Sequence, residues 1–382
     1  MKFITQFCRI FVGVLFVISG LIKLNDPVGT AIKMEEYFEV FAESLAFFKI
    51  FVPFSTAISV IFCVAEVVLG IAVLLQYRMK ITMWGMMLLI LFFSFLTFYS
   101  AYFEKVTDCG CFGDAIKLEP WHSFWKDIIL LVMILPLFLQ MNRLKSVFSK
   151  KTGDYVMLGF TFLCFFMAYW VMNHLSFIDF RAYKVGASIP ENMKLPPNAK
   201  PDIFEIKYSM KNLVSGDEKT ITDKEYMESK IWEDTTWQIT STAPPKLIQK
   251  GDKPKITDYR IFNTEGDDFT QESFEGEKII ILLEHADKAS PKPSKKIATL
   301  ITSAQEKKMT VWVVTGSDYK TYEPFRHEWQ WSAPFFNADP KVIKTIIRSN
   351  PGIMLLKDGV VKAKWHHNDT PELKEIEKKL KG

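Results

Sequence analysis

The chain has 382 residues and a formal net charge of +4, a length that allows two or three domains. This weak charge, with no Lys/Arg cluster interleaved with aromatic residues, excludes nucleic acid as a partner. Phe, Leu, Ile, Val and Met concentrate in residues 1–175, whereas most Lys, Asp, Glu and Pro follow in residues 176–382. The two halves predict a region in the lipid bilayer followed by a soluble region.

Five apolar segments are long enough, at about 20 residues, to cross a bilayer as helices. They cover residues 3–24, 51–76, 81–103, 122–141 and 154–173. The first is too long for the apolar core of a signal peptide and lacks a small-residue cleavage site, so we expect it to be retained. Residues 31–48 predict an amphipathic helix lying in the membrane interface.

The basic residues of the short loops predict the orientation of these helices. Residues 78–80 and 143–151 carry Arg and Lys without an acid, and such loops stay in the cytoplasm. The N-terminus then also lies inside, whereas the loops after the first and third helices and the C-terminal region lie outside. We therefore expect a bacterial inner-membrane protein with a periplasmic C-terminal domain.

The soluble region predicts a linker and one α/β domain. Beyond the linker, buried strands at 278–283 and 310–315 alternate with helices, and a hairpin at 352–365 precedes a final helix. This is the thioredoxin order of elements. The predicted domains are a four-helix membrane bundle (1–150), a fifth transmembrane helix (151–175), an extracytoplasmic linker with a small β-rich segment (176–254) and a thioredoxin-like domain (255–382).

A cysteine pair lies in the loop between the third and fourth helices. Cys109 and Cys111 are separated only by Gly110, which permits the tight bend that a bond between them would need. We expect such a small ring to be strained and easily reduced, which suits redox exchange. A structural disulfide or two idle thiols remain alternatives, and a zinc site would need two further ligands, for which His122 is a weak candidate.

Four polar residues in or near the apolar segments are further candidates. Glu66 lies in the middle of the second apolar segment, so it should face the bundle interior, paired or protonated. It could serve a bound quinone, with Lys23 as a second cofactor-binding candidate, or hold helices together by a hydrogen bond. Lys23 and Asp26 are otherwise interface anchors. His122 is a proton shuttle beside the cysteines or a solvated loop histidine.

In the soluble domain, Asn350-Pro351 precedes the hairpin. In thioredoxin-like folds a cis proline occupies this place and shapes the surface that receives partner chains, so these two residues are partner-binding candidates. The place for a redox Cys-x-x-Cys, after the strand at 278–283, reads Glu284-His285-Ala286-Asp287 and has no thiol. The domain therefore keeps the scaffold without its own thiol chemistry.

Together, Ser19-Gly20-Leu21-Ile22-Lys23-Leu24-Asn25-Asp26-Pro27, Glu66 with Gly70, and the Cys-Gly-Cys-Phe-Gly-Asp loop resemble the DoxX-like, MauE-type redox-associated membrane proteins. The whole chain resembles the long Bacteroidetes form of that family, with a fifth helix and a TlpA-like domain. The resemblance implies a bundle akin to quinone-linked thiol oxidoreductases that works with periplasmic thioredoxin-like partners. Cys109 and Cys111 would then exchange electrons with a partner protein.

Two functions follow from these features. The first is thiol–disulfide or quinone-linked electron exchange through the Cys109/Cys111 loop with a periplasmic partner. The second is a non-catalytic membrane scaffold whose thioredoxin-like domain binds a periplasmic or envelope export or assembly complex. A transporter finds little support, since the five segments show no inverted repeat.

Overall fold

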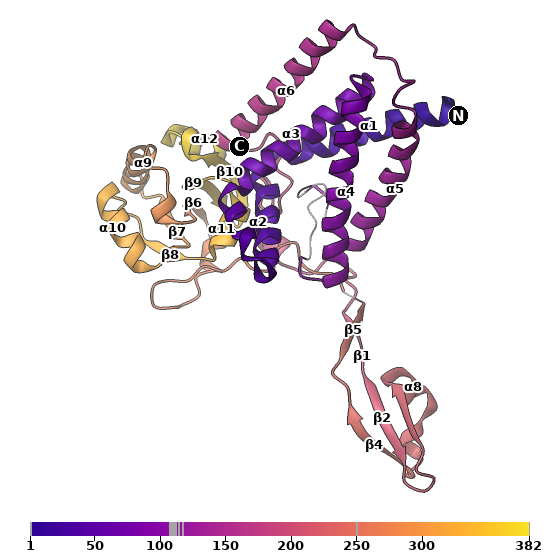
Figure 1. The fold of residues 1–382 in the computed structure, drawn as a ribbon. Helices are drawn as coiled ribbons and strands as arrows, with labels where there is room; N and C mark the ends of the chain where they lie inside the picture. Colours follow the sequence, from indigo (N-terminus) through magenta and orange to yellow (C-terminus); the bar gives the residue numbers. More distant parts are fainter. Residues whose placement is uncertain (1, 107–112, 114, 117, 250, 382) are drawn as a thin grey trace. The chain divides into compact units, whose positions relative to one another are not determined.

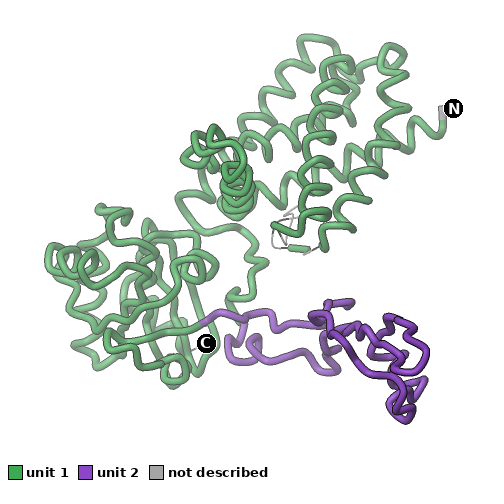
Figure 2. The backbone as a smooth tube through the Cα atoms, turned by 60° about the horizontal axis from the view of Figure 1, so that its bottom comes forward, with its two compact units in different colours: residues 1–186, 260–382 green, residues 187–259 purple. Residues whose placement is uncertain are grey.

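The computed structural model describes residues 2–106, 113, 115–116, 118–249 and 251–381. The chain divides into two compact units, residues 1–186 with 260–382 and residues 187–259 (Figure 2). The first unit contains the apolar helices and an α/β domain. The second is a small β-rich unit.

Five helices among the described residues are long and apolar enough to span a membrane (Figure 1). They are α1 (Lys2–Asn25), α3 (Ser55–Leu74), α4 (Met79–Phe103), α5 (Pro120–Leu139) and α6 (Lys150–Asn173). One face of each is buried, and large apolar side chains such as Phe7, Leu88 and Phe162 stay exposed on the other. This surface suits lipid, where exposed apolar groups carry no hydrophobic penalty.

Small residues let α1 and α3 pack closely in antiparallel directions. A Cβ added to Gly20 would lie 2.9 Å from the Val67 nitrogen, and one added to Gly70 would lie 2.9 Å from the Gly13 oxygen. Glycine at such positions allows the close backbone approach that is common between membrane helices. As a result, the end of α1 and the start of α3 share one end of the bundle with the end of α4 and the start of α5. We call it the loop end.

The segment between α1 and α3 folds into α2 (Pro27–Ser44) and a 3-10 helix, η1 (Ala46–Phe54). Asp26 caps α2 by accepting a hydrogen bond from the Gly29 nitrogen, and Pro27 stands at its first turn, where its missing N–H costs nothing. The helix predicted at 31–48 therefore begins and ends earlier. It also buries Ala31, Met34 and Tyr37, and its position in the membrane interface stays a prediction.

The α/β domain contains one five-stranded sheet in the order β10-β9-β6-β7-β8 (Figure 1). Its strands are β6 (Glu277–Leu283), β7 (Thr310–Thr315), β8 (Phe335–Asn337), β9 (Gly352–Lys357) and β10 (Val360–His366), and its helices are α9 (Ser294–Glu306), α10 (Tyr319–Trp329), α11 (Pro340–Ile346) and α12 (Leu373–Lys381). β6 pairs in parallel with β7 and antiparallel with β9. The predicted thioredoxin order is confirmed.

The central strand β6 is buried from Lys278 to Leu283, which explains why its sequence is a continuous apolar run rather than an alternating one. Ile279 and Ile281 belong to the core together with Ile297 and Ile301 of α9. Before β6, Phe262 forms isolated antiparallel bridges with Asp268 and with Asn337 of β8.

The second unit contains a three-stranded antiparallel sheet in the order β3-β2-β4. Its elements are α7 (Ile189–Asn192), β1 (Ile203–Glu205), β2 (Lys207–Asn212), β3 (Glu218–Thr222), α8 (Asp223–Ser229), η2 (Ile231–Glu233), β4 (Trp237–Thr242) and β5 (Lys246–Gln249). β1 and β5 form a separate antiparallel ribbon. Thr222 and Glu225 form a capping box at the start of α8.

Candidate functional site

The predicted redox pair, Cys109 and Cys111, lies outside the described residues. The following described residue, Gly113, lines a cavity of about 30 Å³ together with Ile22, Asn25 and Asp26. The chain just after the cysteine pair therefore lies beside the end of α1.

Inside the bundle, Lys23 of α1 and Glu66 of α3 form an ion pair at 2.5 Å. Only 6% of the lysine side chain and 7% of the glutamate side chain are exposed, and the lysine Nζ also lies 4.7 Å from the centre of the Phe93 ring. Glu66 is thus buried and paired, as expected of an intramembrane carboxylate. The expectation that Lys23 extends its charge to the interface is wrong, because its ammonium group is buried on Glu66.

A second ion pair, absent from the sequence-based candidates, lies on α5. Lys126 Nζ is 2.7 Å from Asp127 Oδ1, and Thr97 Oγ1 of α4 donates to Asp127 Oδ2 at 3.1 Å. The sequence carried a signal for this pair, since Asp127 lies within the predicted apolar segment 122–141.

The two ion pairs line one cavity in the bundle. Lys23, Glu66, Lys126 and Asp127 all face it, among apolar side chains that include Phe16. The cavity measures about 20 Å³, which is room for a water molecule. The structure therefore brings together Glu66 and Lys23, the two cofactor-binding candidates, and adds a second acid and a second base.

His122, the predicted proton shuttle, is an exposed residue at the start of α5. Its Nδ1 lies 3.5 Å from the Glu119 carboxylate, and 72% of its side chain is exposed. It does not line the cavity of the two ion pairs. No group of three His, Cys, Asp or Glu side chains in the described part of the chain is placed to hold a metal ion.

In the thioredoxin-like domain, the Asn350–Pro351 peptide bond is cis. Pro351 is buried, and the Asn350 side chain donates to the carbonyl oxygen of His285 at 2.8 Å. The two predicted features, the proline loop and the segment after β6, are therefore neighbours, as the fold requires. Their role in binding a partner stays a prediction.

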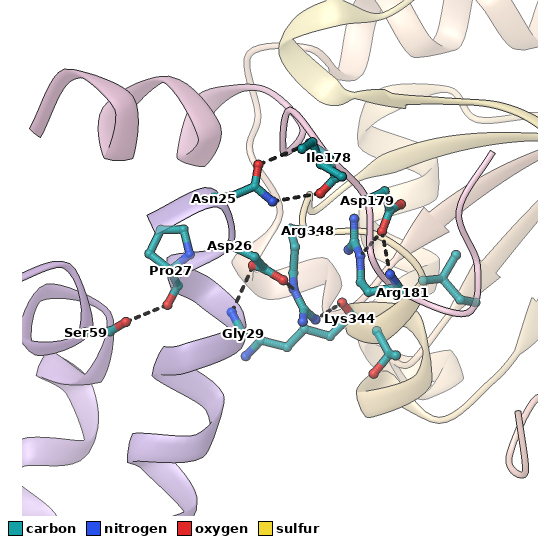
Figure 3. Close-up of polar contacts among 12 residues, drawn as sticks. Asn25, Asp26, Pro27, Gly29, Ser59, Ile178, Asp179, Arg181, Lys344 and Arg348 are labelled. Carbon is teal, nitrogen blue, oxygen red and sulfur yellow. Dashed lines mark hydrogen bonds and ion pairs between the residues drawn. The ribbon is translucent and has the colours of Figure 1, made fainter. Parts of the chain in front are cut away.

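The proline loop is continuous with polar contacts that join this domain to the loop end of the bundle (Figure 3). Arg348, two residues before Asn350, pairs with Asp26 at 3.0 Å. At the end of α1, Asn25 donates to the carbonyl oxygen of Ile178 at 2.7 Å and accepts from its nitrogen at 3.1 Å. Asp26 is thus an α2 cap and an ion-pair partner rather than a free interface anchor.

A second group of charges lies in the segment after α6. Asp179 accepts from Arg181 at 2.7 Å and pairs with Lys364 of β10. Burial works to raise the pKa of Asp179, but the adjacent Arg181 and Lys364 outweigh it and lower that pKa to about 2. Burial and then repulsion by Arg181 lower the pKa of Lys364 to about 8. Both pKa values are lowered, that of Asp179 by the adjacent cations and that of Lys364 chiefly by burial.

Comparison with known proteins gives matches for parts of the chain. Residues 1–140 match the family of methylamine utilisation protein MauE. The chain is also 30% identical over 158 residues to protein TlpB of Flavobacterium psychrophilum, a match that covers 40% of each chain. The matched segment thus spans less than half of that relative's length.

Two solved structures resemble the α/β domain. A thioredoxin-like protein from Aeropyrum pernix aligns with 32% of this chain and 88% of its own length, at 13% identity and a TM-score of 0.27. A secreted disulfide oxidoreductase of Mycobacterium tuberculosis aligns with 32% of this chain and 95% of its own length, at 14% identity and a TM-score of 0.26. With scores this low, the fold assignment rests on the strand order described above.

Proposed function

Because this chain joins a MauE-type membrane region to a thioredoxin-like domain, we propose that it is a membrane-anchored thiol–disulfide exchange protein. The matches support a membrane-associated, redox-related role in the coarser sense. The finer proposal is that Cys109 and Cys111 exchange electrons with a protein partner outside the cytoplasm. The described residue that follows this pair, Gly113, lies at the loop end of the bundle.

The positions of the cysteines along the chain are the main support for this proposal. Cys8, Cys63 and Cys164 are buried within membrane helices, and a buried thiol in apolar surroundings is inert. Residues 176–382 contain no cysteine, so the thioredoxin-like domain cannot exchange thiols itself. Cys109 and Cys111 are the remaining pair in the chain, and Gly113 beside them lies at the loop end near Asp26.

In the proposed reaction, a partner thiolate attacks one sulfur of a Cys109–Cys111 disulfide. The S–S bond breaks, a mixed disulfide forms, and the other cysteine leaves as a thiolate. A second partner thiolate then attacks the mixed disulfide, so the partner becomes oxidised and both cysteines are reduced. Two electrons move from the partner to the pair, and the reverse sequence of steps returns them.

Quinone binding at Glu66 and Lys23 stays a separate prediction. The two side chains already pair with each other, and the cavity beside them, at about 20 Å³, is too small for a quinone ring. A quinone at these two residues would require the bundle to open at this cavity. Extraction and chromatography of lipids from the purified protein would test it, and a stoichiometric quinone would show that the bundle opens.

Trapping of the mixed disulfide tests the exchange reaction. A Cys111→Ser variant leaves Cys109 without its resolving thiol, so we expect a covalent adduct with a partner that reducing agent releases. Cys63→Ser, which removes a buried thiol, is the matched control and should form none. If the Cys111→Ser and Cys109→Ser variants both give no adduct, and the native pair shows one redox state under oxidising and reducing conditions, the exchange function is refuted.

A scaffold function is the second candidate. It is favoured by a thioredoxin-like domain that keeps its fold, including Asn350 and Pro351, while carrying no cysteine. The domain would then bind a periplasmic or envelope export or assembly complex. A Cys109→Ala/Cys111→Ala variant should retain that complex on affinity purification, whereas the exchange function predicts that its redox activity is lost.

Both functions require the loop end and the thioredoxin-like domain to lie outside the cytoplasm. The proposed location is the bacterial inner membrane, and the basic loops at 78–80 and 143–151 support it. To test this, a cysteine is introduced at one of two exposed positions, Tyr319 in the domain or Leu139 beside the basic loop. Intact spheroplasts are then treated with a thiol reagent that does not cross the membrane. We expect labelling at 319 alone, and the opposite result would reverse the orientation.

A further inference from the structure

The four charged groups in the bundle form one electrically balanced cluster. Lys23, Glu66, Lys126 and Asp127 come from three helices, α1, α3 and α5, and line the same water-sized cavity. Ionisable groups inside a membrane are costly and commonly mark proton or ion paths. A single ion pair would suffice to hold two helices together, so the second pair at the same cavity calls for another role.

The two pairs differ in their access to the surface of the bundle. The side chains of Lys23 and Glu66 are 6% and 7% exposed, so this pair is enclosed. The Asp127 side chain is 2% exposed, but that of its partner Lys126 is 23% exposed. Lys126 can therefore turn toward the surface and leave Asp127, because a long lysine side chain readily extends to the membrane interface. Lys23 has no such exit.

A buried hydroxyl lies on the loop side of Asp127. Ser123 precedes Asp127 by four residues on α5, so the two share one face of the helix. The serine is 1% exposed, and its Oγ makes no hydrogen bond in the described structure. On the facing helix α4, Thr97 already donates to Asp127. Asp127 thus lies between a hydroxyl group nearer the loop end and the cavity that it shares with Glu66.

We propose that Asp127 is the outer acid of an intramembrane proton-exchange site whose inner acid is Glu66. A proton reaches an Asp127 oxygen from the loop side past Ser123 while Lys126 turns to the surface. The O–H bond at Asp127 then breaks as its proton passes to a water in the cavity, and that water delivers a proton to Glu66. Lys23 stays an ammonium ion throughout, and the reverse path returns the proton.

This site would supply or accept the protons that accompany thiol exchange. That role rests on the proposed function. Each disulfide reduced to two thiols takes up two protons, and the partner dithiol that becomes oxidised releases two, so the site would hold protons between these steps and no net proton is consumed. The proton-exchange site itself needs no cysteine, so the two proposals can fail separately.

Carboxyl labelling with a hydrophobic carbodiimide, which reacts with protonated acids, tests the site. The full chain in lipid vesicles is labelled at one fixed pH and analysed by mass spectrometry. In Glu66→Gln we expect Asp127 to react several-fold more slowly, because the cluster loses a negative charge and the added positive field favours ionised Asp127. In Thr97→Val we expect faster reaction, because the carboxylate loses a hydrogen-bond donor. Asp154 of helix α6, which pairs with Arg78, is the internal control, and its labelling should not change.

Unchanged labelling of Asp127 in both variants, or no labelling of Asp127 at any pH at which the protein stays folded, would overturn the proposal. Thr97→Val keeps every charge, so it gives a result even if Glu66→Gln fails to fold. The labelling is repeated in a Cys109→Ser/Cys111→Ser variant. Coupling that persists there, without mixed disulfides in the native chain, would refute the exchange function and leave the proton site intact.

Discussion

At the scale of single residues, the Lys23–Glu66 pair shows how a charge is kept inside the bundle. Each side chain is more than nine-tenths buried and compensates the other. The net gain from such a pair is small, because desolvation consumes most of the attraction, but a single charge left without its partner is expensive. The pair therefore constrains which substitutions the bundle tolerates.

Removing one partner of this pair should destabilise the protein far more than removing both. We expect Lys23→Met or Glu66→Gln to lower the free energy of unfolding by about 3–5 kcal/mol, and the double variant to recover most of the loss. Thermal unfolding in detergent would measure it. The partly exposed pair Lys33–Glu36 is the control, where Lys33→Met should cost less than about 1 kcal/mol. Additive losses in the buried double variant would contradict the prediction.

At the scale of elements, the contact of α1 with α3 depends on glycine. Gly13, Gly20 and Gly70 each lie so close to the opposite helix that a Cβ would approach backbone or side-chain atoms within 3 Å. Without a hydrophobic driving force between helices in lipid, such packing supplies much of their association. The contact also positions Lys23 opposite Glu66.

A methyl group at this contact should separate the two helices. Gly20→Ala places a Cβ 2.6 Å from Val67 Cγ2 and 2.9 Å from the Val67 nitrogen, and we expect a loss of about 1–3 kcal/mol in stability. Gly159 of α6, where a Cβ would meet nothing within 4 Å, is the control, and its alanine variant should be neutral or slightly stabilised. Equal effects in both variants, measured by thermal unfolding, would show that the close approach is unimportant.

At the scale of the whole molecule, buried charges join the thioredoxin-like domain to the loop end of the bundle. Arg348 pairs with Asp26 (Figure 3), and Lys364 pairs with Asp179, so each pair connects segments far apart in the sequence. The contact at Arg348 lies on the same loop as Pro351, so the proline surface and the end of α1 are structurally coupled. This arrangement places the cysteine-free domain next to the loop end of the bundle, where Gly113 lies.

The Asp26–Arg348 pair should stabilise the contact between the thioredoxin-like domain and the loop end of the bundle. Asp26→Asn retains the cap of α2, because asparagine caps helices as well as aspartate, but removes the charge. We expect it and Arg348→Gln each to speed amide hydrogen exchange in residues 176–186 several-fold, measured by mass spectrometry. Lys357→Gln, which breaks an exposed ion pair with Glu277 in the same domain, should leave that segment unchanged. Slow exchange in all three variants would refute the role of the pair.

Acid should weaken the second charged contact of the thioredoxin-like domain, the one between Lys364 and Asp179. The pKa of Asp179 is lowered to about 2 in the folded protein, below its ordinary value near 4. Its ionised form therefore stabilises the fold fully above pH 4, and that contribution, about 2 kcal/mol, is lost as the pH falls from 4 to 2. Unfolding measured across this range should show a weaker pH dependence in Asp179→Asn. An identical pH profile in the variant would exclude Asp179 as the cause.

The lowered pKa of Lys364 has the opposite effect on stability, and it acts at high pH. Its pKa in the folded protein is lowered to about 8, so burying the charged lysine opposes folding below that pH. Between about 8 and 10.5 the unfolded chain holds the extra proton, and stability should rise with pH. Lys364→Met should remove this rise in unfolding experiments, and a rise that persists in the variant would assign it to another group.

Local sequence patterns were sufficient to predict the membrane helices, the order of elements in the thioredoxin-like domain and the burial of Glu66. Each follows from hydrophobic length, from buried strands such as Lys278–Leu283, or from the cost of a lone charge in lipid. These signals lie within short stretches of chain, so they are readable without a structure. The roles of Cys109, Cys111, His122, Asn350 and Pro351 remain predictions.

The tertiary structure alone decided which charges meet. Lys23 resembles an interface anchor in sequence because it lies near the end of a helix, but the close packing of α1 on α3 buries it on Glu66. Asp127 lines the same cavity from a third helix, and Asp26 pairs with Arg348, which lies more than three hundred residues away in the sequence. Such pairings depend on helix rotation and on contacts between distant segments, which short-range periodicity does not specify.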